Sequence, residues 1–224
     1  MNYFITGGTG FIGHNLISEL LRKKKKVHIY VLIRRGSKKK FESLKEEWGV
    51  AAKRVTPITG DLTKSFLGVP AKKRRELEGK IDHFFHLAAV YDLMADAESQ
   101  VRVNVDGTTN AVKFAESVKA KRFHHMSSIA AAGLYPGVFR EDMFEEAHGL
   151  DNAYFRTKHD SEAVVRSECS MPWRIYRPGI VVGHSETGVI DKIDGPYYFF
   201  KLIQKMRKAL PSWMPTVGLE GGRI

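Results

Sequence analysis

The sequence predicts an α/β fold, in which helices cover both faces of a parallel, doubly wound β-sheet. Short β-branched and apolar segments alternate with segments of helical periodicity along the 224 residues, and this alternation is typical of a parallel sheet with crossover helices. A glycine-rich stretch, TGGTGFIG at 6–13, joins the first apolar segment to the first helical one. The connections between successive strands are expected to be right-handed.

Three strands are expected in the first half of the sheet. YFIT at 3–6 is a short apolar run that ends in glycines, and HNLISELLRKKK at 14–25 follows with leucine and isoleucine at helical spacing. VHIYVLI at 27–33 is rich in β-branched residues and predicts a strand buried on both faces. A charged helix is expected near 38–48, and RVTPITG at 54–60 is the third strand.

The second half of the chain repeats this alternation. A short basic helix leads to the strand IDHFFHLAA at 81–89, and NVDGTTNAVKFAESV at 104–118 lies in a long helical segment. KRFHHMSS at 121–128 is the fifth strand. The helix that contains Tyr154 comes next, and WRIYRPGIVVG at 173–183 is the sixth strand.

Composition indicates a globular protein. A chain of 224 residues is long enough for one domain with a substantial core, and its 43% hydrophobic and 27% charged residues exclude disorder. The single cysteine, Cys169, excludes an internal disulfide and a cysteine-based metal site, and it fits a reducing, cytoplasmic setting. No apolar run is long enough for a transmembrane helix, and MNYFITGG enters a strand directly, so no signal peptide is expected.

The formal net charge of +11 is concentrated in three basic clusters, at 22–26, 34–40 and 72–75. Nucleic-acid binding is one interpretation of such charge. No helix-turn-helix, zinc-finger or RNA-recognition signature accompanies it, so we expect no nucleic-acid partner. The clusters at 22–26 and 72–75 are interpreted as solvated helix ends. At 22–26, where a helix is expected to end, the cations also complement the helix dipole.

The glycine-rich stretch predicts a dinucleotide site. Gly8, Gly10 and Gly13 satisfy G-x-G-x-x-G, and Gly7 with the last two satisfies the looser G-x-x-G-x-x-G. Glycine is needed there for a tight turn, for close approach of the backbone to a pyrophosphate, and for packing of helix on strand. The following helix N-terminus offers unpaired N–H groups to phosphates.

The end of the second strand indicates which dinucleotide is bound. An acidic residue at this point would bind the ribose hydroxyls of NAD. This chain has Arg34 and Arg35 instead, and a guanidinium offers a forked donor to a phosphate. We therefore predict NADPH, although two exposed basic residues would be ordinary in so basic a chain.

Tyr154 and Lys158 are four residues apart in AYFRTKHDSEAVV, so they are neighbours on one helical face. One interpretation is a pair of amphipathic side chains on a solvated face. The other is a general acid whose acidity is increased by a nearby cation.

Several motifs in a fixed order resemble the extended short-chain dehydrogenase/reductase superfamily, and the resemblance implies a Rossmann-type fold over nearly the whole chain. The motifs are TGGTGFIG (6–13), GDL (60–62), HLAA (86–89), NVDGT (104–108), SS (127–128), YFRTK (154–158) and YRPGIVVG (176–183).

This resemblance implies four catalytic residues. Tyr154 would exchange a proton with the substrate oxygen, while Lys158 would bind the nicotinamide ribose and make the phenol a stronger acid. Ser128 would hydrogen-bond the carbonyl oxygen with Ser127 in support, although the assignment between these two serines stays open. Asn104 would support the lysine, or it could be an ordinary helix cap.

The resemblance also implies the residues that bind the cofactor. They are Gly7, Gly8, Thr9, Gly10, Phe11, Ile12, Gly13, Arg34, Arg35, Asp61, Leu62, Ala88, Ala89, Tyr154, Lys158, Pro178 and Gly179. Arg177 is interpreted as structural. No metal site is expected, because the histidines at 83, 86, 124 and 125 are paired at strand spacing without a third ligand nearby.

Longer stretches, such as DHFFHLAAVYDL and GHSETGVIDKIDGPYYFFKLIQK, resemble the N-terminal reductase domain of bacterial fatty acyl-CoA reductases, in the thioester-reductase and male-sterility branch. The resemblance implies NADPH-dependent reduction of an acyl thioester or a fatty aldehyde. The aromatic and basic segment GPYYFFKLIQKMRKALPSWMP, at 195–215, suits a long acyl chain with a phosphorylated handle. It would equally suit an amphipathic helix packed on the core.

We expect a cofactor-binding domain at 1–183 and the beginning of a substrate-binding region at 184–224. Members of this group continue well past this length, so the chain is expected to be a piece of a longer protein with an incomplete acyl pocket. Two alternatives stay open: a nucleotide-sugar epimerase/dehydratase or steroid-like alcohol dehydrogenase of the same superfamily, and a non-catalytic NADP-binding module. Oligomeric state is not predicted, and a homodimer is possible.

Overall fold

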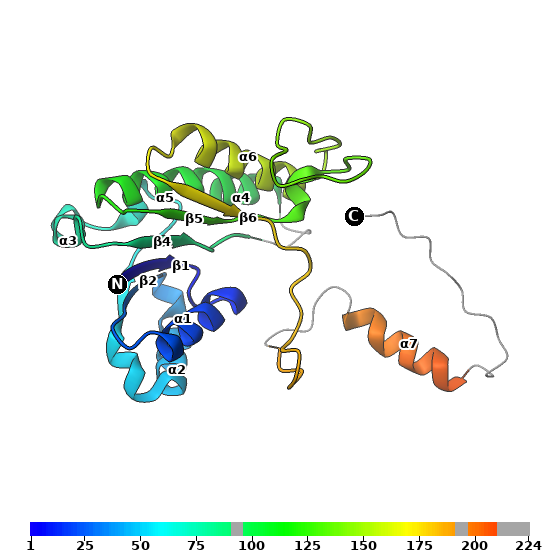
Figure 1. The fold of residues 1–224 in the computed structure, drawn as a ribbon, viewed down its shortest axis with the longest axis horizontal. Helices are drawn as coiled ribbons and strands as arrows, with labels where there is room; N and C mark the ends of the chain where they lie inside the picture. The colour runs from blue at the N-terminus through cyan, green and yellow to red at the C-terminus, as the bar shows by residue number, and fades with distance from the viewer. Residues whose placement is uncertain (91–95, 191–196, 210–224) are drawn as a thin grey trace.

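The computed structural model describes residues 1–90, 96–190 and 197–209. Its centre is a six-stranded sheet in which every neighbouring pair of strands is parallel (Figure 1). The strand order is β3-β2-β1-β4-β5-β6, which is the order of a Rossmann fold, and the predicted fold class is confirmed. The strands are β1 (Asn2–Thr6), β2 (His28–Ile33), β3 (Val55–Thr59), β4 (His83–His86), β5 (Phe123–Met126) and β6 (Trp173–Tyr176).

Helices cover both faces of the sheet (Figure 1). On one face lie α1 (Phe11–Lys23) and α2 (Lys38–Trp48), and on the other lie α5 (Asp106–Ser117) and α6 (Ala153–Glu168). Within the described residues, no helix is long and apolar enough to cross a membrane. The remaining elements are α3 (Ala71–Leu77), α4 (Ala97–Gln100), α7 (Tyr197–Ala209), a π-helical turn η4 (Val101–Val105), and 3-10 turns η1 (Arg35–Ser37), η2 (Gly49–Arg54), η3 (Ser65–Gly68) and η5 (Ile129–Ala132).

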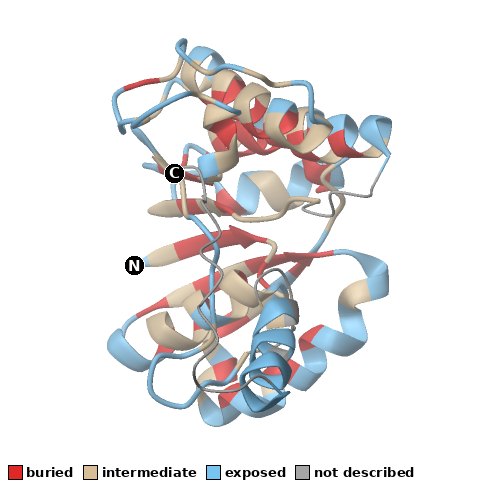
Figure 2. Cartoon of the chain, turned by 90° about the vertical axis from the view of Figure 1, so that its right-hand side faces the viewer, coloured by how far each residue is buried: buried red, intermediate tan, exposed pale blue. Residues whose placement is uncertain are grey.

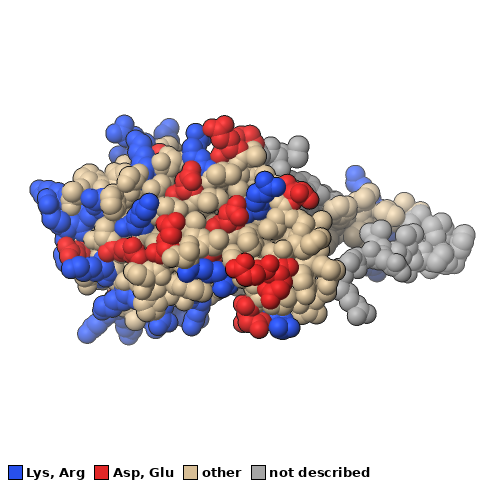
Figure 3. Space-filling model, turned by 90° about the horizontal axis from the view of Figure 1, so that it is seen from above, with Lys and Arg blue, Asp and Glu red and all other residues tan. Residues whose placement is uncertain are grey.

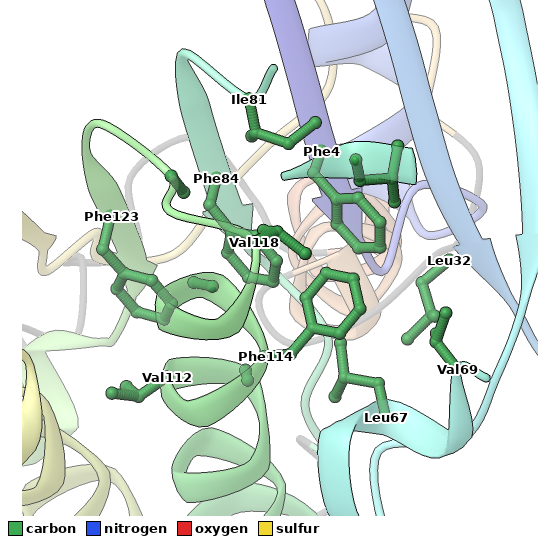
Figure 4. Close-up of a cluster of buried hydrophobic side chains, with 14 of the residues drawn as sticks. Phe4, Leu32, Leu67, Val69, Ile81, Phe84, Val112, Phe114, Val118 and Phe123 are labelled. Carbon is green, nitrogen blue, oxygen red and sulfur yellow. The ribbon is translucent and has the colours of Figure 1, made fainter. Parts of the chain in front are cut away.

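Two hydrophobic clusters form because successive side chains of each strand point to opposite faces. Phe4 of β1 stacks on Phe84 of β4, with ring centres 5.0 Å apart, and contacts Phe114 of α5 (Figure 4). Ile5, the next residue, lies in the other cluster together with Ile17 of α1. All five of these side chains are completely buried. The central strands are therefore apolar at consecutive positions, as the sequence predicts.

Several predicted element boundaries differ from the structure; the fourth and fifth strands, for example, are shorter than predicted, at His83–His86 and Phe123–Met126. The sixth strand was expected over 173–183 but ends at Tyr176, where β5 also ends and where Pro178, which has no N–H group, follows closely. The first helix begins at Phe11 rather than at His14, because the glycine-rich turn itself leads into its first turn.

Burial and charge distinguish the two ends of the molecule. Buried residues follow the sheet and the inner faces of its helices, whereas α7 is largely exposed (Figure 2). Lysine and arginine side chains gather at the end of the molecule opposite α7 (Figure 3). Some of them are paired there, as Lys119 is with Glu78 and Lys121 with Asp82, both at 2.7 Å. The cluster at 22–26 lies at the C-terminal end of α1, as predicted, whereas the cluster at 72–75 lies inside α3, which continues to Leu77.

Candidate active site

A cleft of about 970 Å³ runs along the carboxyl ends of the parallel strands. In open α/β sheets, ligands bind in the crevice at these strand ends. Most of the predicted site residues line this cleft. Its lining consists of Gly7 and 9–13 after β1; Leu32, Ile33, Arg34, Ser37 and Lys40 from β2 to α2; 61–63 after β3; 87–90 and Val103 after β4; 126–128 after β5; Tyr154 and Lys158 on α6; and 178–181, Ile190 and Tyr197 after β6.

The glycine-rich turn is held in a conformation that larger residues could not adopt. Gly7 has a φ of +72°, and a Cβ atom there would lie 2.6 Å from the backbone nitrogen of Ala88. A Cβ atom on Gly13 would lie 2.2 Å from the carbonyl oxygen of Gly7. Gly8 does not line the cleft; a side chain there would collide with Val31 of β2, so this glycine allows α1 to pack on the sheet.

The N-terminus of α1 opens into the cleft and fits a pyrophosphate. Its N-cap is Gly10, which supplies no side-chain hydrogen bond, and the first turn contains no acidic residue. The free N–H groups and the positive end of the helix dipole are therefore available to an anion. The glycine cradle leaves the backbone accessible at the same point, so the residues present fit a dinucleotide.

At the β2 end of the cleft, Arg34 is a lining residue whereas the adjacent Arg35 is not. Asp61, which follows β3, also lines the cleft and accepts hydrogen bonds from the backbone and side chain of Thr63, at 2.9 and 2.8 Å. The hydrogen bonds from Thr63, with weaker help from Lys64 and Arg34, hold the pKa of Asp61 below its usual value. Asp61 is therefore ionised at neutral pH and organises the turn.

Tyr154 and Lys158 line the opposite end of the cleft. Asn152 is the N-cap of α6 and accepts a hydrogen bond from Tyr154 N at 2.8 Å, which fixes the tyrosine in the first helical turn. The Lys158 ammonium nitrogen is 5.9 Å from the centre of the Tyr154 ring and donates to the carbonyl oxygen of Met126 at 3.3 Å. Burial lowers the pKa of Lys158 to about 8, and the nearby carboxylate of Glu162 opposes this effect.

The two serines after β5 lie in different environments. Ser127 is 3% exposed, and its hydroxyl donates to Glu162 at 2.5 Å. Ser128 is half-buried, lines the cleft, and accepts a hydrogen bond from Ala130 N at 3.2 Å. The Ser128 hydroxyl can therefore donate a hydrogen bond into the cleft, whereas the Ser127 hydroxyl already donates to the carboxylate of Glu162.

Asn104 lies behind the cleft and does not line it. Its side-chain amide is buried, accepts from Val90 N at 2.8 Å, and donates to Val90 O at 2.9 Å. It also donates to Thr157 of α6 at 3.2 Å. Asn104 belongs to the π-helical turn before α5, so it does not cap that helix; it ties the loop after β4 to the helix that carries Tyr154 and Lys158.

A family model adds to this geometry. The model described as male sterility protein, an NAD-binding family, matches residues 5–220. The chain belongs to this male sterility family. The family lies within the extended short-chain dehydrogenase/reductase superfamily, as the motifs predicted. Proteins of this family bind a nicotinamide dinucleotide, and the glycine-lined cleft fits such a cofactor.

Several members and relatives of the family are similar to this chain. Aldehyde reductase lnbA of Aspergillus flavus is 30% identical over 85% of the chain, and fatty acyl-CoA reductase wat of Drosophila melanogaster is 30% identical over 86%. The terminal R domain from the myxalamid PKS-NRPS biosynthetic pathway superposes with a TM-score of 0.78 at 28% identity over 92% of the chain. The chain spans 21%, 46% and 55% of these three proteins, respectively.

Sequence reasoning missed several residues of the cleft in this male sterility family member, among them two polar residues near Arg34, and it missed Glu162 behind the cleft. Ser37 and Lys40 line the cleft beside Arg34. The basic cluster at 34–40 could have indicated them, but only its two arginines are interpreted as phosphate-binding residues. Glu162 carried no signal of its own, because a glutamate on a helix usually faces solvent.

Part of the aromatic and basic segment after β6 forms the helix α7. The Tyr197 hydroxyl accepts a hydrogen bond from Gly183 N at 2.7 Å, and Tyr197 is the one described α7 residue among those lining the cleft. Other apolar side chains of α7 are exposed by 46–63%, so they do not pack on the core within the described residues. These side chains are Phe199, Phe200, Leu202, Ile203 and Met206.

The strand histidines make side-chain contacts with neighbouring strands and with the helices that cover the sheet. His86 lies between Thr6 and Thr108, at 2.8 and 3.1 Å, and His124 lies between His83 and Tyr176, at 3.0 and 2.9 Å. Burial lowers the pKa of His86 to about 3, so the ring is neutral. Among the residues that the structure describes, no group of three or more His, Cys, Asp or Glu could hold a metal ion.

Proposed function

We propose that this chain is the cofactor-binding and catalytic part of an NADPH-dependent reductase that acts on a long-chain acyl thioester or fatty aldehyde. The observation that carries the proposal is a single cleft with a phosphate cradle at its centre. Arg34 lies at one end of this cleft, and Ser128, Tyr154 and Lys158 lie at the other. The relatives named as aldehyde reductase, as fatty acyl-CoA reductase and as a terminal R domain support a reductive role.

NADPH is favoured over NADH by three donors at the β2 end of the cleft. Arg34, Ser37 and Lys40 could bind a 2′-phosphate there. Asp61, the one acidic side chain among the described residues that line the cleft, is engaged with Thr63. A hydrogen bond to a charged group contributes about 1.5–3 kcal/mol. Since about 1.4 kcal/mol corresponds to one decade, we expect NADPH to bind roughly tenfold to a hundredfold more tightly than NADH.

The chain's own residues supply the proton chemistry. NADPH, when bound, supplies a hydride to the carbonyl carbon. The Ser128 hydroxyl donates a hydrogen bond to the carbonyl oxygen, and Tyr154 transfers its phenolic proton to that oxygen. Lys158, held in its charged form below pH 8, stabilises the resulting phenolate.

A thioester substrate needs one further step. The carbon–sulfur bond breaks, the sulfur leaves as a thiolate, and Tyr154 takes back the hydroxyl proton as the carbonyl reforms. Thioester, NADPH and one proton thus give aldehyde, thiol and NADP⁺. With an aldehyde substrate, the product of the first step is already the alcohol.

The long acyl group is supported by the far end of the cleft. Ile180, Val181, Ile190 and Tyr197 line it, and the exposed apolar side chains of α7 continue from Tyr197. Lys205, Arg207 and Lys208 lie on the same helix and could meet the phosphates of a coenzyme A or carrier arm. An apolar wall beside cations fits such a substrate better than it fits a nucleotide sugar.

Cofactor choice is tested by fluorescence titration of the chain with NADPH and NADH. Arg34→Ala should remove most of the preference for NADPH. Arg35→Ala is the matched control, because it deletes an equal charge at the neighbouring position outside the cleft, and it should keep the preference. Equal affinities of the unaltered chain for both cofactors would contradict the proposal.

Substrate class is tested by product analysis. The complete protein that carries these residues is incubated with NADPH and palmitoyl-CoA or a long-chain aldehyde, and the products are identified by mass spectrometry. We expect aldehyde or alcohol from these substrates and no change in sugar nucleotides. Epimerised sugar nucleotide without reduction of any acyl substrate would favour the epimerase alternative instead.

A further inference from the structure

Glu162 is a completely buried carboxylate one helical turn after Lys158 on α6. It accepts a hydrogen bond from Ser127 at 2.5 Å. Arg177 binds both of its oxygens, through Nε at 2.9 and 3.2 Å and through Nη2 at 2.7 Å. A buried ion pair of this kind is weak evidence for a stabilising role, because the cost of removing both charges from water is large. Its specific geometry therefore requires another explanation.

The three partners come from the three segments that supply the end of the cleft where Tyr154 lies. Ser127 directly precedes Ser128, and Arg177 directly precedes Pro178. Glu162 itself belongs to the helix of Tyr154 and Lys158. We propose that Glu162 is a positioning residue, whose carboxylate holds these three segments in register and places a fixed negative charge one turn from Lys158.

Backbone bonds extend this connection on both sides of Ser128. Ser127 N donates to Tyr176 O at 2.8 Å, and Ile129 N donates to Pro178 O at 3.1 Å. Ser128 thus sits between two residues that are bound to the chain around Arg177. If the guanidinium shifts, both the serine loop and the Pro178 loop shift with it, and a displacement of about 1 Å in an active site can cost about a hundredfold in rate.

The charge of Glu162 acts on Lys158 in a site with few other charges. Tyr154 lies on the same helix, His86 faces the lysine from β4, and His125 faces it from β5. Burial lowers the pKa of both histidines, so both rings are neutral near pH 7. The carboxylate also has two cations near it, Arg177 at 2.7 Å and Arg166 at 3.9 Å.

The carboxylate of Glu162 favours the protonated form of Lys158, whereas burial disfavours it. Burial lowers the pKa of Lys158 to about 8, and the negative charge of Glu162 raises it. Removing this charge must therefore lower the pKa further. In the reaction proposed above, on which this inference rests, the loss of the lysine charge would begin at a lower pH.

The test compares two variants that separate position from charge. Glu162→Gln removes the charge and the strong acceptor, whereas Arg177→Lys weakens the two-oxygen contact but leaves the carboxylate beside Lys158. Lys158 is titrated by the pH dependence of its labelling with an amine-reactive reagent, read by peptide mass spectrometry. This readout needs no turnover, so it remains informative even if the chain proves to have another activity.

We expect a labelling midpoint near pH 8 in the unaltered chain, a lower midpoint in Glu162→Gln, and an unchanged midpoint in Arg177→Lys. Both variants should lose about tenfold or more in kcat with palmitoyl-CoA and NADPH, with a smaller change in the KM for NADPH. If Glu162→Gln does not fold, Glu162→Asp replaces it, and it should keep the midpoint while lowering kcat. An unchanged midpoint in Glu162→Gln, or an undiminished kcat in Arg177→Lys, would overturn the inference.

Discussion

The Lys158 ammonium nitrogen lies 5.9 Å from the centre of the Tyr154 ring, and both side chains border the cleft that begins at the glycine-rich turn. The spacing of four residues on α6 brings the two side chains together, but how strongly the lysine charge can act depends on burial. Lys158 is 5% exposed, so its charge is largely shielded from water, and in the proposed reaction it would act on a phenolate at Tyr154 through protein. A solvated pair on an open helix face would have no such effect.

Tyr154→Phe should remove the proton donor and leave the cleft otherwise intact. General acid catalysis typically contributes about 10²–10⁴-fold, so turnover of an acyl thioester or aldehyde should fall by that factor. The dissociation constant of NADPH, measured by fluorescence, should change little. Phe155→Leu is a suitable control, because the neighbouring side chain is not among those lining the cleft. Near-normal turnover in Tyr154→Phe would contradict the assignment of this tyrosine.

Lys158→Met should make the chain more stable while it abolishes turnover. A pKa near 8 in place of the ordinary 10.5 corresponds to about 3 kcal/mol of unfavourable charge burial at neutral pH, before the lost bond to Met126 is considered. Urea unfolding without cofactor at pH 7 should therefore show an increase of roughly 1–3 kcal/mol in the free energy of unfolding.

The same burial predicts how this gain depends on pH. Because the pKa of Lys158 is lower in the folded chain than in the unfolded chain, the destabilising cost is complete below pH 8. It fades as the pH rises from about 8 towards 10.5, so the advantage of Lys158→Met should shrink over that window. A difference that stays constant from about pH 7 to 10 would show that the lysine is not buried as a cation.

Asn104→Ala should weaken both the fold and the cofactor site. The substitution leaves the backbone N–H and C=O of Val90 without their partner, and an unsatisfied buried group costs about 1–3 kcal/mol. Val90 lines the cleft, so NADPH affinity should fall as well. Asn15→Ala is the control, since that exposed side chain bonds only within α1 and should change stability by about 0.5 kcal/mol or less. An NADPH affinity equal to that of the control would argue against the bridging role.

Gly13→Ala should disturb the phosphate cradle. A Cβ atom there would lie 2.2 Å from Gly7 O and 2.7 Å from Gly8 Cα, and both are backbone atoms that cannot move independently. We expect a loss of about 1–3 kcal/mol in stability and a weakening of NADPH binding by about tenfold or more. In Gly107→Ala, the nearest atom outside the local helix is 3.4 Å away, so this control should bind NADPH normally. Equal effects of the two substitutions would show that the cradle is not specific.

The fold class was predictable because its signals are local. The alternation of strand and helix depends on side-chain periodicity within about ten residues, and the glycine-rich turn depends on backbone geometry within about eight. The order of the strands across the sheet was not predicted, because it depends on which strands pair after the chain has folded. The position of the cleft follows from the fold class, because parallel strands bring all their carboxyl ends to one edge.

The sequence by itself determined the fold class, the family and the residue types that gather at the cleft. It could not separate Ser127 from Ser128, or Arg34 from Arg35, because adjacent residues of the same type carry the same local signal. Tertiary packing separated the serines through a hydrogen bond to Glu162, 35 residues away along the chain. Likewise, Asn104 acquires its role from Thr157, at a separation of 53 residues. Such contacts depend on how helices dock across the sheet, and no periodicity in the chain encodes them.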